Sequence, residues 1–382
     1  MSEHLREAVI DLDAVRDNTA ELTRRANRAG VMAVVKADAY GHGLVPCARA
    51  AVSGGATWLG VALTEEALAL RAAGLQTPIL AWLTGPGEDY RSALEASVDL
   101  SVSSARGLQE VAAAAAATGR TARVHLKLDS GLGRAGCPAS GWAELVEAAH
   151  RTEVDGTVTV TGVWSHLAYA DAPGHPTIDR QIATYRDALT VADAGGLKPQ
   201  VRHLANSAAT LTRPDALFDL TRPGLAVYGL SPVPSEATPA ELGLQPAMSL
   251  HARFTLVKEV PAGYGVSYQH QYVTSRATSL GLLPVGYADG IPRNATNVGP
   301  LIAAGRRRTI AGTVCMDQVV VDLERDQCEP GDVAVLFGPG DSGEPTAQDW
   351  AEATATISYE IVTRIGPRVR RRYLGDLEHG RD

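Results

Sequence analysis

The stretch VMAVVKADAYGHG, residues 31–43, decides the fold of this chain. An unbroken apolar run leads up to Lys36, and a polar turn with glycines at 41 and 43 follows at once. Such a run is typical of a strand that is buried on both faces of a parallel sheet. Burial disfavours the charged form of an amine and lowers its pKa. Lys36 is therefore a candidate nucleophile at the end of a buried strand.

Seven more runs along the chain have the same short, Val- and Leu-rich character. They are TWLGVA (57–62), PILAWL (78–83), VDLSVS (98–103), RVHLKLD (123–129), TVTVTGVWSH (157–166), VRHLAN (201–206) and LFDLTR (217–222). Amphipathic segments lie between them, such as 64–74 with Thr64 as the expected N-cap. Strands that alternate with helices form a parallel sheet, and eight of them close a (β/α)₈ barrel. We therefore predict an α/β fold with a TIM barrel over residues 12–240.

The sequence changes character at SPVPSEATPAELG (231–243), where Pro and Ser indicate a linker. Runs with β-like patterns follow, among them LHARFTLVKEV and RTIAGTVCMDQVVVDL, and only 347–355 is predicted to be helical. The second predicted domain is therefore mostly β and covers residues 241–382. Residues 1–11 are a candidate additional strand of it.

Composition excludes several classes of protein. A formal net charge of -8 argues against a nucleic-acid binder that relies on a basic surface. No secretory signal pattern opens the chain, and no apolar run is long enough to span a membrane. The four cysteines are widely spaced without a CxxC pair, so we expect no metal site and a cytoplasmic location.

Polar groups gather at the predicted carboxyl ends of the strands, where the working residues of a (β/α)₈ barrel lie. The residues at these ends are Lys36, Trp82, Lys127, Asp129, His166, Asn206, Ser207 and Arg222. Only four of the 35 basic residues are lysines, and two of them fall inside apolar runs. A lone histidine or asparagine there is often structural, but this combination argues against a structural role for all of them.

The same rim suggests a cofactor. A buried, neutral lysine forms a Schiff base with an aldehyde. The turns after the last two predicted strands offer backbone N–H groups for a phosphate. Pyridoxal 5'-phosphate carries both an aldehyde and a phosphate, and it fits this combination.

A competing motif, GLGRAG (131–136), matches the G-x-G-x-x-G pattern of dinucleotide-binding loops. That pattern requires a helix to begin within it, and here Pro138 and Gly141 delay one. We therefore predict no NAD site and assign Arg134 to the binding of a carboxylate.

Taken together, nine motifs resemble those of the alanine racemases, a family of pyridoxal-phosphate enzymes with a barrel and a β domain. The motifs are AVVKADAYGHG, HLKLDSGLGRAG, WSHLAYAD, HLANSAA, TRPGLAVYG, AGYGVSY, LPVGYADG, GTVCMDQ and ISYEI. They run in order from about residue 11 to about residue 371, and the full set is specific to the family.

The resemblance implies a two-base mechanism within a homodimer whose active sites are shared. Lys36 would bind the cofactor and act as one base, while Tyr264, from the second subunit, would act as the opposite base. Arg222 would face the pyridine nitrogen, His166 would stack on the ring, and Trp82 would lie beside it.

The resemblance also implies the remaining contacts. The implied phosphate ligands are Tyr40, Ser207, Gly224, Leu225 and Tyr359, while Asn206 is a cofactor-binding candidate because it opens the turn that contains Ser207. Arg134 would bind the substrate carboxylate with help from the backbone N–H of Met316, and a carbamylated Lys127 would fix Arg134. Asp317 and Tyr287 would line the entrance.

The implied activity is the interconversion of L-alanine and D-alanine, with D-alanine supplied for peptidoglycan. Two alternatives remain open on the residues alone. One is a racemase of broad specificity or a barrel-type decarboxylase, and the other is a non-catalytic protein that binds pyridoxal phosphate or an inhibitor. The runs AGYGVSY and VCMDQ beyond the barrel favour catalysis, because a carrier would need only the barrel.

Overall fold

The computed structural model describes residues 4–375, which divide into two compact units. The barrel unit consists of Val15–Ala39 and Leu44–Leu244. Of the described residues, the β unit contains 4–14, Tyr40–Gly43 and 245–375. Each unit is described by itself below.

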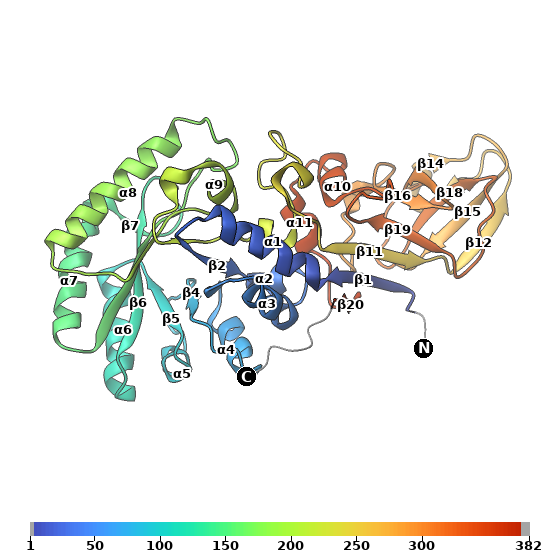
Figure 1. Cartoon of the computed structure of the whole chain (residues 1–382). Coiled ribbons are helices and arrows are strands. Elements are labelled where there is room, and N and C mark those ends of the chain that lie inside the picture. The colour runs from blue at the N-terminus through green and yellow to red at the C-terminus, as the bar shows by residue number, and fades with distance from the viewer. Residues whose placement is uncertain (1–3, 376–382) are drawn as a thin grey trace. The chain divides into compact units, whose positions relative to one another are not determined.

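A parallel sheet forms the centre of the barrel unit (Figure 1). Its strands are β2 (Gly30–Val34), β3 (Trp58–Val61), β4 (Ile79–Ala81), β5 (Asp99–Val102), β6 (Ala122–Asp129), β8 (Val158–Trp164), β9 (Val201–His203) and β10 (Leu220–Thr221), with the short β7 (Cys137–Pro138) beside β6. β10 returns to pair with β2, and a bridge between Asn206 and Arg222 joins the ends of β9 and β10. The ring is thus nearly closed, which confirms the predicted TIM barrel followed by a mostly-β part.

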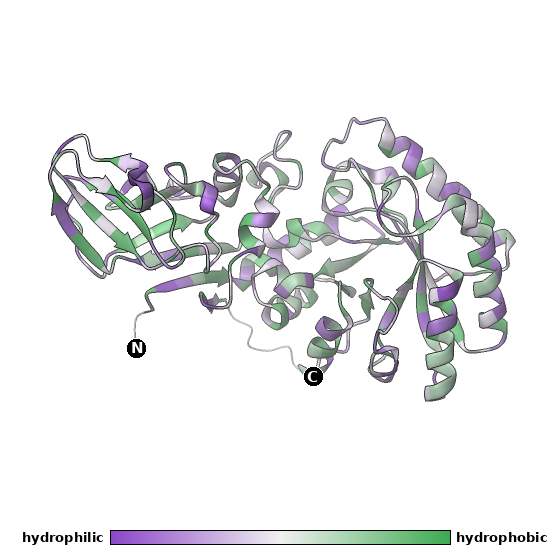
Figure 2. Cartoon of the chain, turned by 180° about the vertical axis from the view of Figure 1, so that it is seen from behind, coloured by the Kyte–Doolittle hydropathy of each residue, from purple (hydrophilic) through white to green (hydrophobic). Residues whose placement is uncertain are grey.

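Helices connect these strands. They are α1 (Leu12–Arg25), α3 (Leu44–Ser53), α4 (Thr64–Ala72), α5 (Tyr90–Glu95), α6 (Ala105–Thr118), α7 (Trp142–Val154), α8 (Thr177–Ala194) and α9 (Ser207–Thr212), with 3₁₀ turns at Ala139–Gly141, Pro214–Ala216, Leu225–Tyr228 and Ala240–Leu242. The long helices carry hydrophilic and hydrophobic residues side by side, as expected of helices that cover a barrel (Figure 2). Inside the ring, Met32, Trp58, Leu80 and Leu220 form a buried cluster.

Two local predictions for the barrel were wrong. The N-cap of α4 is Leu63 and not Thr64, because the Glu66 carboxylate accepts hydrogen bonds from the backbone N–H groups of Ala62 and Leu63. The last strand is also shorter than 217–222, since Phe218 has a positive φ of 49° that breaks the extended chain.

The turn after Lys36 is a turn of left-handed helix. Ala37, Asp38, Ala39 and Tyr40 all have φ between 53° and 55°. Each such residue costs about 1–2 kcal/mol relative to the right-handed form. Two side chains offset part of this strain, because Glu66 accepts from the Ala37 N–H and Asp38 accepts from the Leu44 N–H. The backbone therefore turns sharply before Gly41, and strain of this kind gathers at functional sites.

The β unit contains two larger sheets. The first has the order β17-β16-β19-β11-β1-β20, with strands Arg306–Thr309, Pro300–Ala303, Val333–Phe337, Met248–Arg253, Arg6–Asp11 and Arg370–Leu374. The second has the order β12-β15-β18, with strands Leu256–Val260, Thr278–Leu283 and Val319–Glu324. The N-terminal strand β1 lies between β11 and β20.

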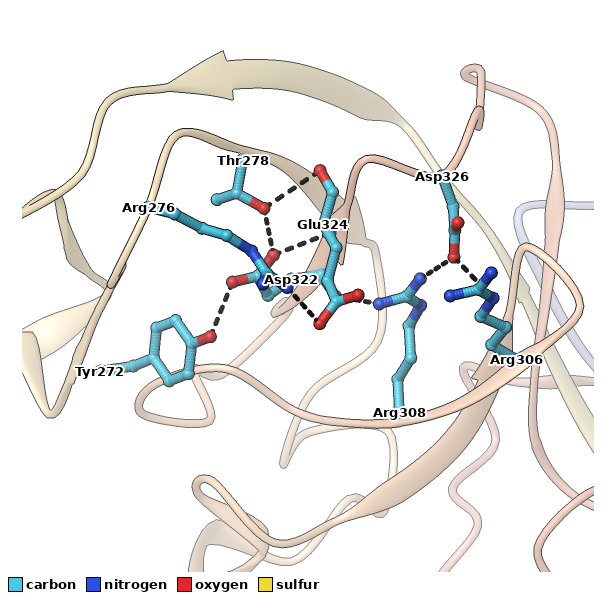
Figure 3. A network of polar contacts seen from close by, with 8 residues as sticks. All are labelled: Tyr272, Arg276, Thr278, Arg306, Arg308, Asp322, Glu324 and Asp326. Carbon is cyan, nitrogen blue, oxygen red and sulfur yellow. Dashed lines mark hydrogen bonds and ion pairs between the residues drawn. The ribbon is translucent and has the colours of Figure 1, made fainter.

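A small hairpin of β13 (Gly265–Val266) and β14 (Tyr272–Val273) carries a 3₁₀ turn, η5 (Tyr268–His270), at its tip. A polar network ties this hairpin to the second sheet (Figure 3). The Tyr272 hydroxyl donates to Asp322 on β18 at 2.6 Å, and Thr278 on β15 donates to the same carboxylate. The base of the hairpin is thereby fixed to two strands.

The β unit contains more helices than the sequence predicted. α10 (Ala347–Ala353) was expected, but α11 (Ser358–Thr363) was not, and a further 3₁₀ turn covers Arg293–Ala295. The segment of α11 is too short for its apolar residues Ile361 and Val362 to reveal a helical period. None of the helices within residues 4–375 is long and apolar enough to cross a membrane.

Candidate active site

The carboxyl ends of the parallel strands form one rim of the barrel unit, and four of the predicted residues come to it from four strands. Lys36 lies just beyond β2, Lys127 lies in β6, His166 lies just beyond β8, and Arg222 directly follows β10. This is the rim on which the active sites of (β/α)₈ barrels are built.

Arg222 is buried and bound on all sides. Its guanidinium donates to the carbonyl oxygens of Ser165 and Leu204 at 2.7 and 3.1 Å and to His203 Nδ1 at 3.0 Å, and it lies 3.4 Å from His166 Nδ1. Burial lowers the pKa of Arg222 to about 10, which leaves the side chain protonated at neutral pH. A protonated guanidinium has no acceptor, so whatever faces Arg222 must accept.

A chain of buried hydrogen bonds continues from Arg222 through the barrel. His203 Nε2 lies 2.8 Å from His125 Nδ1, and His125 Nε2 lies 3.2 Å from Asp99 Oδ2. Since Arg222 only donates, His203 must carry its proton on Nε2, and the same logic places the proton of His125 on Nε2, toward Asp99. Sequence reasoning missed His125 and Asp99. The available signal was that His125 shares a strand face with Lys127, two residues on.

Lys127 lies in an electropositive setting. Its Nζ is 4.2 Å from the ring centroid of Trp164, and the Arg222 Cζ is 4.7 Å from the same centroid. Burial, and then the charges of Arg222 and Arg134, lower the pKa of Lys127 to about 8. Its side chain is therefore partly a neutral amine at neutral pH.

Burial and nearby positive charges also lower the pKa values of Lys36 and His166. Burial and then the charge of Arg134 lower the pKa of Lys36, and burial with Arg222 lowers that of His166 well below its ordinary value. Trp82 directly follows β4, and the Lys36 Nζ lies 5.9 Å from its ring centroid. The rim thus combines a surplus of cationic groups with a lysine that loses its proton more easily than usual.

Ser207 begins α9, whose N-cap is Asn206. The Ser207 hydroxyl oxygen accepts from the backbone N–H groups of Gly224 and Ala226 at 2.8 and 3.2 Å. Its own proton remains able to donate, and Leu225 begins a 3₁₀ turn on the same side. Two helical N-termini and one hydroxyl therefore meet, which is an arrangement suited to an anion.

The backbone N–H groups of the GLGRAG loop already have a hydrogen-bond acceptor within the chain. The Asp129 carboxylate accepts from the backbone N–H groups of Gly131, Leu132 and Gly133 at 2.9 to 3.1 Å. These are the groups that a dinucleotide phosphate would need. The exposed Arg134 follows directly, and its charge acts on Lys36, Lys127 and His166.

In the β unit, a cavity of about 530 Å³ brings together two segments that are distant in sequence. Its lining consists of Ser267, Tyr268, Cys315, Met316, Asp317 and Gln318. The Tyr287 and Ala288 N–H groups donate to the carbonyls of Cys315 and Met316 at 3.0 and 2.9 Å. Within residues 4–375, no acceptor is recorded for the Met316 N–H, so this donor is available to a ligand.

The structure does not bring Tyr264 to this cavity. Tyr264 lines a smaller cavity of about 190 Å³, where its ring centroid lies 5.5 Å from Lys258 Nζ. The neighbouring tyrosine, Tyr268, is the one beside Met316 and Asp317, and it is 67% exposed. Tyr268 stands in the same AGYGVSY motif as Tyr264 and was not among the predicted site residues.

The other predicted residues of the β unit fall into two groups. Tyr40 and Tyr359 have ring centroids 6.1 Å apart, and burial raises the pKa of Tyr40 above its ordinary value. Asp317 pairs with Arg368 at 2.8 Å, and Arg368 also pairs with the buried Asp289 at 3.2 Å. Arg368 thus links the Asp317 carboxylate to the buried Asp289 and fixes its orientation.

These sites and the fold define a class of enzyme: a barrel with a lysine of lowered pKa at its rim, followed by a β unit with its own polar cavity. Two family models match the chain, "Alanine racemase, N-terminal domain" over residues 10–232 and "Alanine racemase, C-terminal domain" over residues 247–373. The chain belongs to the alanine racemase family and is an amino-acid racemase.

Individual relatives agree with this assignment. The alanine racemase of Frankia casuarinae is 61% identical over 367 residues, covering 96% of both chains. That of Streptomyces coelicolor is 58% identical over 374 residues, covering 97% of this chain and 96% of the relative. The crystal structure of alanine racemase from D-cycloserine-producing Streptomyces lavendulae superposes with a TM-score of 0.98 at 59% identity, covering 99% of each chain.

Proposed function

We propose that this racemase interconverts L-alanine and D-alanine with pyridoxal 5'-phosphate bound at the rim of the barrel unit. The observation that carries the proposal is Lys36, a buried lysine of lowered pKa among the cationic side chains of Lys127, Arg134 and Arg222. A neutral amine suits the aldehyde of this cofactor, and the surplus of positive charge suits its phosphate and a substrate carboxylate. When bound, the cofactor supplies an electron sink that acidifies the Cα–H bond of an amino acid.

Residues of the barrel unit would tune and orient this chemistry. Arg222 would donate to the pyridine nitrogen and keep a proton off it, which weakens the electron sink and limits side reactions. His166 would lie against the ring and Trp82 beside it. Asn206 and the Ser207 hydroxyl, with the backbone of Gly224 and Leu225, would hold the phosphate.

Racemisation requires a proton to leave one face of Cα and another to arrive on the opposite face. Two fixed groups do this without moving, so we assign one face to Lys36 and the other to a tyrosine. The sequence pointed to Tyr264 for this role. Tyr264 is 40% exposed, so its phenol is accessible to a substrate held by another subunit.

Remaining assignments follow the family resemblance. Arg134 would bind the substrate carboxylate together with the Met316 N–H, and carbamylated Lys127 would fix Arg134. The lowered pKa of Lys127 supports this modification, since only a neutral amine reacts with CO₂. The tyrosine and Met316 would come from the second subunit of a homodimer.

Further predictions rest on the resemblance alone. Tyr40 and Tyr359 would complete the phosphate site, and Asp317 with Tyr287 would line the entrance. The D-alanine product would serve peptidoglycan, in the cytoplasm.

The function is tested by incubating the purified protein, loaded with pyridoxal phosphate, with L-alanine and measuring D-alanine with a D-amino-acid oxidase. Lys36→Ala is the matched control and should form none. Absence of D-alanine with the loaded wild-type protein would refute the proposal. Faster turnover of serine, lysine or arginine than of alanine would favour a racemase of broad specificity.

A further inference from the structure

The hydrogen-bond chain from Arg222 through His203 and His125 to Asp99 crosses the barrel unit. His203 ends β9 at the rim, whereas Asp99 begins β5 and therefore lies at the opposite end of the barrel. His125 and His203 are fully buried, and Asp99 is 2% exposed. Asp99 is also paired with the half-exposed Arg123 at 2.8 Å. The chain thus joins an ion pair at one end of the barrel to the cationic rim at the other.

The barrel strands make room for the two imidazole rings. A Cβ on Gly162 in β8 would lie 2.3 Å from His125 Nδ1, and the pairing of β6 with β8 shifts register next to His125. Glycine inside a strand weakens it and often marks a close approach of this kind. The ring of Trp164 stacks on that of His203, with centroids 5.6 Å apart and planes at 7°. Both rings are therefore held in fixed positions.

The two ends of the chain fix the direction of its hydrogen bonds. Arg222 can only donate, and an ionised Asp99 can only accept. Burial raises the pKa of Asp99, but hydrogen bonds from His125 and Arg123 outweigh this effect and the pKa is lowered. Burial and then the charge of Arg222 lower the pKa of His203 well below its ordinary value, so its ring is neutral. A neutral imidazole donates through one nitrogen and accepts through the other, and its partners decide which.

This direction matters for the guanidinium of Arg222. Its Nη2 donates to the carbonyl oxygens of Ser165 and Leu204, and its Nη1 donates to His203 Nδ1. Among the described residues, none accepts from its Nε, which leaves that donor for a ligand. A proton on His203 Nδ1 would face the Nη1 hydrogen and force the guanidinium to turn.

We propose that Asp99 and His125 are positioning residues for Arg222, because they keep His203 Nδ1 free of a proton and so fix the orientation of the guanidinium. The inference rests on the proposed function, in which Arg222 faces the pyridine nitrogen of the cofactor. It adds that the orientation of this rim residue is set from the opposite end of the barrel.

Asp99→Asn tests the chain without changing the shape of the side chain. Arg123 can only donate, so it retains the amide oxygen and turns the amide NH₂ toward His125. His125 Nε2 must then accept, and the protons of both rings move to Nδ1. A shift of about 1 Å in a reacting group costs about 100-fold in rate. We expect kcat for L-alanine to fall about 10- to 100-fold, with KM within about threefold, because neither ring is predicted to contact the substrate.

Arg123→Gln is the matched control. It removes the ion pair from the same carboxylate but leaves Asp99 as the acceptor for His125. Since the side chain of Arg123 is 39% exposed, its loss opens no buried cavity. This variant should keep both tautomers and retain kcat within about twofold of the wild-type value.

The tautomers are read directly from long-range ¹H–¹⁵N spectra of the cofactor-loaded enzyme labelled with ¹⁵N-histidine. His125→Gln and His203→Gln assign the two signals. The wild type and Arg123→Gln should carry both protons on Nε2, and Asp99→Asn should carry both on Nδ1. A merely structural role for Asp99 would lower activity without moving these protons.

Several results would overturn the inference. They are a proton on Nδ1 of either ring in the wild type, an Asp99→Asn variant with normal kcat, a loss of kcat in that variant with unchanged tautomers, and an Arg123→Gln variant as slow as Asp99→Asn. The spectra need no turnover. If the wild-type enzyme forms no D-alanine, the proposed function fails, and the spectra still decide whether Asp99 sets the direction of the chain.

Discussion

The titration of Lys127 can be predicted in detail. The pKa of this side chain is lowered to about 8 by burial and by the charges of Arg222 and Arg134. At pH 7, a pKa of about 8 leaves about 9% of the amine neutral, against about 0.03% for a lysine of ordinary pKa near 10.5. Lys127 should therefore hold about 300 times more reactive amine at pH 7 than an ordinary lysine does.

Competitive labelling measures this directly, because the chain has only four lysines and each falls in a distinct peptide. Cofactor-loaded enzyme in CO₂-free buffer is labelled with a trace of a small acylating reagent between pH 6 and 11. Mass spectrometry then reports the labelling of each lysine, with the exposed Lys198 as the internal reference. The midpoint for Lys127 should lie near 8.

Two substitutions test the electrostatic cause of the lowered Lys127 pKa. Arg134→Ala removes one of the positive charges that lower the pKa, so the Lys127 midpoint should rise. Asp129→Asn removes a negative charge that raises the pKa, so the midpoint should fall. A midpoint at or above 10 in the wild type, or movement in the opposite directions in the variants, would refute this electrostatic reasoning. With ¹³C-bicarbonate, a carbamate resonance that is lost in Lys127→Ala would support the modification.

Two substitutions in the β unit test its local structure. Tyr272→Phe removes the 2.6 Å hydrogen bond to Asp322 and should lower the free energy of unfolding by about 1–3 kcal/mol, and an unchanged urea midpoint would contradict this. Gly41→Ala adds a Cβ 2.5 Å from the Val362 carbonyl oxygen at a φ of +81°, so it should destabilise the protein by more than about 1 kcal/mol. Gly305→Ala, with φ +70° but open space around it, is the control that isolates the clash.

Much of the fold was predictable because its signals are local. The barrel strands are apolar runs, and several of them end beside a polar residue, as β2 ends beside Lys36. Since all eight strands are parallel, their ends had to share one rim, which brought His166 and Arg222 to it. Boundaries were less predictable where backbone strain decided them, as at Phe218.

The residues that sequence reasoning missed depend on contacts across the fold. The hydrogen bonds from His203 through His125 to Asp99 join three strands, and no spacing in the sequence reveals them. The two tyrosines of AGYGVSY are four residues apart, and a turn glycine adjoins Tyr264. Their surroundings differ in the folded β unit, where Tyr264 lies beside Lys258 and Tyr268 lies beside Met316 and Asp317.

Lys36 and Tyr264 are proposed to serve opposite faces of Cα, and solvent exchange in matched tyrosine variants measures whether they do. Cofactor-loaded Tyr268→Phe and Tyr264→Phe are each incubated in D₂O with L-alanine and, separately, with D-alanine. We expect Tyr264→Phe to lose racemisation but still to exchange the α-proton of one enantiomer, while Tyr268→Phe exchanges and racemises both. Loss of racemisation in Tyr268→Phe with normal activity in Tyr264→Phe would contradict this assignment, as would racemisation by Tyr264→Phe at the wild-type rate.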